Sequence, residues 1–252
     1  MKIIVDKIKI PQLTGNAERN LYIRLPEDYD REKQSYPVLY MFDGHNVFFD
    51  SHATYGKSWG MGEYLDFIHS KLIVVAVECN HEGYGRLHEY SPFQVKIKPE
   101  GMLKGLGGIY MDWLVETLKP LVDGMFRTIP DREHTYICGS SMGGLMSLYA
   151  VSAYNHVFSK AAALSPTLYF GTSKVLDFIK SSHMDSSTMV YMDYGSEELE
   201  GHKAAAAAFK KVYNALLDGR VMVCARIVPN GTHCEASWER QIPVFMRCLE
   251  ME

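Results

Sequence analysis

The sequence lacks several features that would assign it to a special class of protein. Basic residues show no excess: 26 lysines and arginines face 30 acidic residues, which gives a formal net charge of −4 and a pI near 6.2. With no surplus of positive charge to neutralise phosphates, we expect no nucleic-acid partner. No apolar run approaches the length of a membrane span, so we expect no membrane partner either.

We also expect no disulfide framework, no leader segment and no linker. Its cysteines are odd in number and have no C-x-x-C spacing, which indicates reduced thiols (Cys79, Cys138, Cys224, Cys234 and Cys248). Residues 1–10 alternate polar and apolar side chains like a strand and lack the apolar core of a signal peptide, so we expect a cytoplasmic protein. No repeat or Pro/Ser-rich stretch divides the sequence, and residues 1–252 are interpreted as a single domain.

What is present is an alternation of apolar strands with helical segments. Residues 36–42 and 72–77 are nearly continuous apolar runs, typical of strands buried on both faces. The pattern predicts an α/β fold with a mostly parallel central sheet and helices on both faces. The other predicted strands are 2–10, 21–25, 135–138, 161–164, 189–194 and 221–228, and the predicted helices are 111–126, the segment after Ser141, 173–182, 204–217 and 237–249.

One stretch carries a catalytic pattern. The apolar run from Thr135 leads into Gly139-Ser140-Ser141-Met142-Gly143, which has the form G-x-S-x-G and precedes a helical segment of small and apolar residues. This context is that of a nucleophile elbow, a tight strand-to-helix turn that exposes a serine hydroxyl. The alternative is an ordinary glycine-rich turn. We interpret Ser141 as a nucleophile because a partner histidine lies downstream.

A serine hydroxyl needs an adjacent base, and the base needs an orienting acid. His233 lies between the last predicted strand and the last helix, where an α/β-hydrolase places its base. The acid should follow the strand 189–194. Asp193 lies within that strand, whereas Glu197 and Glu198 follow it in a loop and remain equal candidates from their positions alone.

An oxyanion hole needs two main-chain donors. The first is the N–H of Met142, directly after the predicted nucleophile. The second is expected from the loop after strand 36–42, which reads Asp43-Gly44-His45-Asn46, and there we assign the N–H of His45. The polar residues of this loop could equally satisfy its own backbone, and the two interpretations are compatible.

With these residues assembled, the chain resembles the putative esterase family of α/β-hydrolases, which includes esterase D, siderophore, feruloyl and acetyl-xylan esterases and mycolyltransferases. The elbow and the Asp-Gly-x-Asn loop at 43–46 are its most specific landmarks, accompanied by 86–92, Leu164-Ser165-Pro166, 194–198 and 231–233. In that family the acid commonly stands three residues after a glycine like Gly195. The resemblance therefore favours Glu198, although many relatives have aspartate at that position.

The resemblance implies a serine ester hydrolase that acts on a small acyl, sugar-linked or siderophore-type ester. The alternatives are an acyltransferase of the same fold and a binding protein without activity. No cofactor is expected. No metal site is expected because the sequence has no H-E-x-x-H, and His81-Glu82 alone is too little for one. Candidates for the substrate cleft are Asn46, Arg86, Glu89, Tyr90, Ser140 and Trp238, although Arg86, Glu89 and Tyr90 fit a loop-pinning role better and Trp238 fits the core better.

Overall fold

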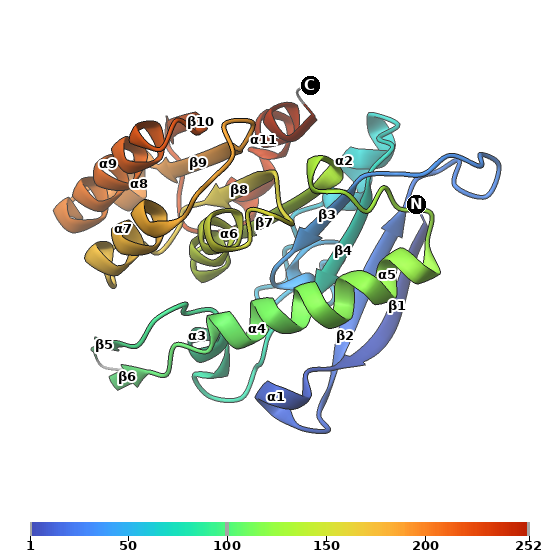
Figure 1. The fold of residues 1–252 in the computed structure, drawn as a ribbon, viewed down its shortest axis with the longest axis horizontal. Helices are drawn as coiled ribbons and strands as arrows, with labels where there is room; N and C mark the ends of the chain where they lie inside the picture. The colour runs from blue at the N-terminus through green and yellow to red at the C-terminus, as the bar shows by residue number, and fades with distance from the viewer. Residues whose placement is uncertain (1, 99–100, 251–252) are drawn as a thin grey trace.

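An eight-stranded sheet runs through the protein in this computed structural model, which describes residues 2–98 and 101–250 (Figure 1). Its strands are β1 (Lys2–Lys9), β2 (Glu18–Leu25), β3 (Val38–Met41), β4 (Ile73–Val77), β7 (Thr135–Ser140), β8 (Lys160–Leu164), β9 (Met189–Gly195) and β10 (Met222–Val228). They lie in the order β1-β2-β4-β3-β7-β8-β9-β10. Neighbours from β4 to β10 are parallel, whereas β1 pairs with β2 and β2 with β4 antiparallel. A separate short hairpin joins β5 (Val95–Ile97) to β6 (Gly101–Leu103).

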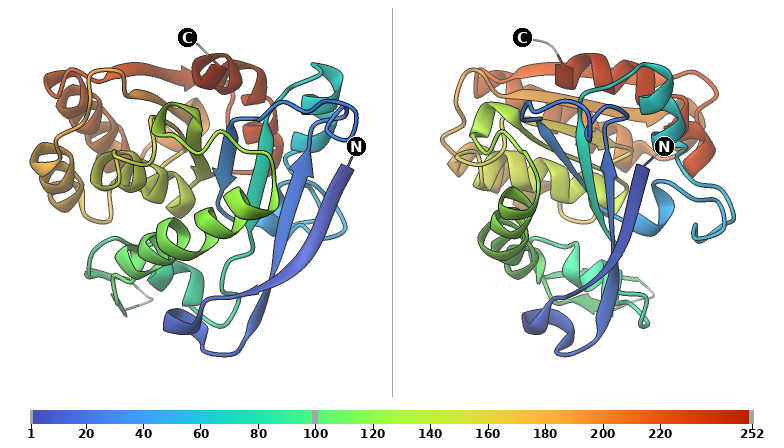
Figure 2. Two further views of the ribbon diagram at one scale, coloured as in Figure 1. Left: turned by 45° about the vertical axis from the view of Figure 1, so that its right-hand side comes forward. Right: turned by 90° about the vertical axis from the view of Figure 1, so that its right-hand side faces the viewer.

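Helices lie on both faces of this sheet, as the turned views in Figure 2 show. One face is covered by α4 (Gly107–Trp113), η2 (Leu114–Leu118), α5 (Lys119–Met125), α6 (Met142–Ala153), α7 (Thr172–Ser181) and α9 (Lys203–Asp218). The other face is covered by α2 (Met61–Phe67), α10 (Glu235–Glu239) and α11 (Ile242–Glu250). Shorter helical turns are α1 (Pro11–Thr14), η1 (Gly44–Asn46), α3 (Gly85–Glu89), η3 (Arg132–His134) and α8 (Ser196–Leu199). None of the helices within residues 2–98 and 101–250 combines the length and apolarity needed to cross a membrane.

Alternate residues of each central strand enter the two cores. In β4, Ile73 and Val75 belong to the core that includes residues of α4 and α6, whereas Val74 and Ala76 belong to the core that includes residues of α2 and α11. Because successive side chains of a strand point to opposite faces, both sets must be apolar when both faces are covered. This double burial explains why the central strands appear in the sequence as uninterrupted apolar runs.

The predicted fold class is confirmed, and so are the positions of the predicted strands. The segment 237–249 is the exception among the helices, since the structure breaks it into α10 and α11 near Gln241. Pro243 explains the break: it has no N–H to donate and is accepted only in the first turn of a new helix. No strand or helix was predicted between residues 78 and 110, but the described residues there form α3, β5 and β6.

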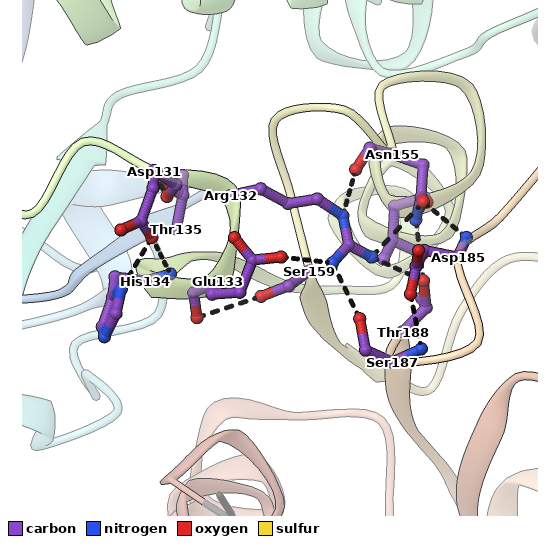
Figure 3. Close-up of polar contacts among 11 residues, drawn as sticks. Asp131, Arg132, Glu133, His134, Thr135, Asn155, Ser159, Asp185, Ser187 and Thr188 are labelled. Atoms are coloured by element: carbon purple, nitrogen blue, oxygen red, sulfur yellow. Dashed lines mark hydrogen bonds and ion pairs between the residues drawn. The ribbon is translucent and has the colours of Figure 1, made fainter.

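The guanidinium of Arg132, just before β7, links three segments near the N-terminal ends of β7 and β9 through hydrogen bonds (Figure 3). It donates to the carbonyl of Asn155 at 2.6 Å, to Thr188 Oγ1 at 2.8 Å and to Ser187 Oγ at 2.9 Å. These partners follow α6 and precede β9. The network therefore stabilises the edge of the sheet opposite to the C-terminal strand ends, where ligands bind in such folds.

Candidate active site

Ser141 stands on a strained turn between β7 and α6. Its φ of 57° and ψ of −119° fall in a region that residues other than glycine rarely adopt. A Cβ on Gly139 would lie 2.7 Å from the main chain of Gly143, so the turn closes this tightly only with glycine there. The fold of this segment therefore matches the predicted elbow.

The hydroxyl of Ser141 has a hydrogen-bond partner that the sequence did not suggest. Its Oγ lies 3.3 Å from Thr167 Oγ1, and the Thr167 N–H donates to the Ser141 carbonyl at 3.0 Å. Among the hydrogen bonds of the described residues, this hydroxyl pairs with Thr167 and not with His233. His233 nevertheless lines the same pocket as Ser141.

Two loops bring a carboxylate against His233. Gly195, at the end of β9, and Gly231, after β10, approach so closely that a Cβ on Gly195 would lie 2.1 Å from the Gly231 carbonyl oxygen. This contact holds the loop of Glu198 beside the loop of His233. Glu198 Oε2 lies 2.6 Å from His233 Nδ1. Since an ionised carboxylate only accepts hydrogen bonds, Nδ1 carries the proton and Nε2 is left free to accept one.

The other oxygen of Glu198 is held by two donors. Oε1 accepts the Ser165 hydroxyl at 2.7 Å and the Gly195 N–H at 2.9 Å. Because Trp238 Nε1–H donates to Ser165 Oγ at 3.0 Å, the proton of the Ser165 hydroxyl must be directed to Glu198. Burial by itself raises the pKa of Glu198, but the bonds from His233, Ser165 and Gly195 outweigh it and lower the pKa below its usual value.

The two competing carboxylates lie elsewhere. Glu197 is exposed to solvent. Asp193 is buried and accepts the Tyr191 hydroxyl at 2.6 Å and the Ser165 N–H at 3.1 Å. Burial, only partly offset by these bonds, raises the pKa of Asp193 to about 6. Asp193 therefore supports the backbone under Ser165 and has no bond to the histidine.

The two residues expected to supply the oxyanion-hole donors come from different elements, α6 and the loop after β3. Met142 is the first residue of α6, so its N–H has no acceptor within the helix. His45 follows Asp43, whose φ of 57° starts the turn η1. Arg86 stabilises this turn, because its Nε and Nη2 donate to the two carboxylate oxygens of Asp43, each at 2.7 Å. The Tyr90 hydroxyl accepts the Asp43 N–H at 3.2 Å.

The cleft candidates 86–90 divide into two groups. Arg86 lines the pocket and forms the ion pair with Asp43 described above. Glu89 and Tyr90 do not line it: both are fully buried, and Glu89 accepts two hydrogen bonds from Arg19, each at 2.8 Å. For Glu89 and Tyr90 the structure therefore corrects the assignment to the cleft and shows the loop-pinning alternative, because their polar atoms are already paired inside the protein.

The pocket at Ser141 has a volume of about 410 Å³. Four further cleft or oxyanion candidates line it: His45, Asn46, Ser140 and Trp238. Trp238 is at the same time a core residue, only 6% exposed, with its ring edge-on to His233 at 5.1 Å. The pocket also contains residues that were not individually named as cleft candidates, namely Thr54, Tyr55, Cys79, Asn80, Gly83 and Glu235.

Glu235 is the least expected of these because it is a buried carboxyl, 6% exposed, at the start of α10. Asn46 Nδ2 donates to its Oε1 at 3.3 Å, and burial raises its pKa. Its position two residues after His233 was the only signal in the sequence. The roles of Ser165 and Thr167 were equally hard to predict. Ser165 lies in the Leu-Ser-Pro landmark and Thr167 directly follows it, but the landmark did not indicate which polar atoms their side chains would contact.

Comparison with known proteins places the chain in a family. The family model described as putative esterase matches residues 13–245. Protein YbbA of Bacillus subtilis (strain 168), which is described as uncharacterized, is 24% identical over 186 residues, 73% of this chain and 70% of that protein. Esterase Rv1288 of Mycobacterium tuberculosis (strain ATCC 25618 / H37Rv) is 25% identical over 182 residues, 71% of this chain but only 35% of that protein, so the match spans about a third of its length.

Solved structures show the same fold at lower identity. A ferulic acid esterase superposes with a TM-score of 0.72 at 17% identity, covering 98% of this chain and 96% of that one. The enterobactin and salmochelin hydrolase IroE superposes with a TM-score of 0.70 at 17% identity, covering 99% and 95% of the two chains. With the family model spanning most of its length, the chain belongs to the putative esterase family and is an esterase of the α/β-hydrolase fold.

Proposed function

We propose that this esterase hydrolyses carboxylic esters through an acyl-enzyme formed on Ser141. Ser141 Oγ attacks the ester carbonyl carbon while His233 Nε2 takes the hydroxyl proton. The N–H groups of Met142 and His45 donate to the oxyanion of the tetrahedral intermediate. His233 then gives its proton to the leaving alcohol, and in the second half of the reaction it takes a proton from the attacking water.

The observation that carries this proposal is the bond of 2.6 Å between Glu198 and His233, because His233 lines the same pocket as the strained Ser141. The acid comes after β9 and the base after β10, so their meeting is specific to the tertiary structure. A carboxylate whose pKa is lowered stays ionised near neutral pH, where it stabilises the imidazolium that forms during attack. These features support the order Ser141, Glu198, His233 for the triad.

The bond between Ser141 and Thr167 fits a resting state. Rotation about χ1 of Ser141 moves its Oγ between staggered positions without moving the backbone. Hydrogen bonds of catalytic groups are often long in free enzymes and tighten when substrate is bound. We therefore assign Thr167 the role of holding the hydroxyl until an ester displaces it towards His233.

The lining of the pocket supports a compact, polar ester as substrate. Its walls carry imidazole, amide and carboxyl groups, from His81, Asn46 and Glu235 among others, and few aliphatic side chains. A pocket of about 410 Å³ accommodates a small acyl or aryl group but offers no apolar channel for a long acyl chain. The candidate substrates are sugar-linked aryl esters and siderophore-type esters. Two structural neighbours are named for related compounds, one as a ferulic acid esterase and one as an enterobactin and salmochelin hydrolase.

The proposal is tested by turnover and by trapping the acyl-enzyme. Wild type should hydrolyse p-nitrophenyl acetate, and a fluorophosphonate should add one phosphonyl group to Ser141, as located by peptide mass spectrometry. Ser141→Ala should lose both turnover and labelling, whereas Ser140→Ala, its neighbour in the elbow, should still be labelled at Ser141. Substantial turnover by a folded Ser141→Ala variant would overturn the assignment.

A further inference from the structure

A second group of reactive side chains lies in the wall of the same pocket. His45 comes from the loop after β3, and Cys79 and His81 come from the loop after β4. One potential ligand atom from each of the three residues lies within 4.8 Å of those of the other two. In the sequence Cys79 and His81 are two residues apart, whereas His45 reaches the site from the loop after a different strand. Histidine and cysteine are the ligands that Zn²⁺ and similar cations prefer.

The ring of His45 leaves one nitrogen without a partner. Its Nε2 lies 3.0 Å from Thr54 Oγ1. Its Nδ1 is buried and has no hydrogen bond to any described residue, and His45 as a whole is only 4% exposed. An unpaired buried polar atom is destabilising, so native proteins rarely keep one without a reason. A bound cation at Nδ1 would supply the missing partner.

The ring of His81 is oriented in the way that metal-binding histidines usually are. Its Nε2 lies 3.1 Å from Glu78 Oε1, and its Nδ1 faces Cys79 Sγ at 4.0 Å. A carboxylate on the far nitrogen of a histidine fixes the ring and increases its basicity as a ligand. The rings of His45 and His81 meet edge-on with their centroids 4.6 Å apart, so the two imidazoles are direct neighbours.

The distances require only a small adjustment. In a tetrahedral zinc site with bonds of about 2.3 Å to sulfur and about 2.0–2.1 Å to nitrogen, neighbouring ligand atoms lie about 3.3–3.6 Å apart. The ligand atoms, which lie up to 4.8 Å apart, must therefore approach one another by up to about 1.5 Å, and the side chain of His81, which is 52% exposed, has room to move. The carboxylate of Asp43 also lies beside the Cys79 thiol, but both of its oxygens already accept hydrogen bonds from Arg86, so we do not count it among the ligands.

We propose that His45 Nδ1, Cys79 Sγ and His81 Nδ1 bind one borderline-soft divalent cation of the Zn²⁺ type. The thiol releases one proton to solvent for each ion bound, because the thiolate is the ligand. Three protein ligands leave a fourth position open, which faces the pocket. If Ser141 acts there as proposed above, the ion and its water occupy space that the ester needs, and the ion inhibits competitively.

Binding is measured first, because it does not depend on the proposed catalytic roles. Purified chain is stripped of metal and titrated with Zn²⁺ against a chromogenic chelator, and Co²⁺ is used as a spectroscopic probe. We expect one tight site per chain and a sulfur-to-cobalt charge-transfer band. Cys79→Ser should remove the band, His81→Gln should weaken binding at least tenfold, and Glu78→Gln should weaken it about 10–100-fold.

Matched controls separate this site from other thiols and histidines. Cys224→Ser and His183→Gln alter a half-buried cysteine and an exposed histidine that do not line the pocket, and both should bind like wild type. His81→Gln changes an exposed side chain, so it remains informative if Cys79→Ser fails to fold. The absence of a tight site in wild type, or unchanged binding in a folded His81→Gln variant, overturns the proposal.

Activity is the second readout. Zn²⁺ should raise the apparent KM of wild type for p-nitrophenyl acetate, leave kcat unchanged and be reversed by a chelator. In His81→Gln the zinc concentration needed for the same effect, relative to that variant's own metal-free rate, should rise at least tenfold. Tight binding without any change in KM would overturn the competitive effect while leaving the binding site in place. Loss of turnover in Ser141→Ala is tested separately.

Discussion

Replacing Glu198 with glutamine tests the triad most directly, because the structure fixes which way the new amide must face. The donors Ser165 and Gly195 both point at the Oε1 position, and Trp238 prevents Ser165 from turning its proton away. The amide oxygen of the introduced glutamine must therefore take that position. Its NH₂ group then lies where Oε2 stands, 2.6 Å from His233 Nδ1 in the wild type.

This orientation forces the wrong form of the imidazole. An NH₂ group donates, so Nδ1 must accept, and the ring proton moves to Nε2, where it blocks proton transfer from Ser141. An amide in place of a triad acid lowers kcat about 10⁴-fold, which corresponds to about 5.5 kcal/mol in the activation free energy. We expect a loss of about 10³–10⁴-fold for Glu198→Gln.

The assay compares Glu198→Gln with Glu197→Gln, its exposed neighbour, on one chromogenic ester at neutral pH. Thermal unfolding of both variants shows whether the fold is retained. Glu197→Gln should stay within about twofold of wild type because its side chain faces solvent. The reasoning fails if Glu198→Gln keeps more than about a tenth of the wild-type kcat, or if Glu197→Gln is the impaired variant.

Strain, burial and the absence of metal from the proposed mechanism give three more testable outcomes. Ser141→Gly and Ser141→Ala should both be inactive. Denaturant titration should give Ser141→Gly a free energy of unfolding about 1–3 kcal/mol higher than that of Ser141→Ala, since glycine adopts a φ of 57° without strain. Equal free energies of unfolding would show that the turn stores no strain. Burial raises the pKa of Asp193 from 3.8 to about 6, so the folded state keeps a proton that the unfolded chain loses. The free energy of unfolding should therefore fall by up to about 3 kcal/mol between pH 4 and pH 6, relative to Asp193→Asn measured in parallel, and a constant difference across this range would contradict it. Finally, ester hydrolysis should persist after treatment with a chelator, since the proposed mechanism uses no metal; loss of activity that one divalent ion restores would argue against it.

Local pattern was sufficient to predict the frame of the fold. The strands β3 and β4 were found because both of their faces are buried, and α7 and α9 because one side of each helix is apolar. The closing helix was predicted as one segment because its apolar spacing continues past Pro243, although the ring of that residue requires a new start. The short elements between 80 and 108 were missed because they are held by distant partners such as the Arg19–Glu89 ion pair, which no local pattern contains.

The same division holds for the site. The sequence by itself determined the strand-to-helix turn at Ser141 and the position of His233 in a loop at the same edge of the sheet, because both depend on neighbours close in the chain. Position along the chain could not separate Glu197 from Glu198, since adjacent side chains in a loop differ only in where the backbone turns them, and it was the family resemblance that favoured Glu198. The tertiary structure decided which carboxylate meets His233, through the contact of Gly195 with Gly231 and the donors from Ser165 and Trp238. It also brought His45 beside Cys79 and His81, because parallel strands that are distant in sequence end at the same edge of the sheet, and only there do their side chains meet.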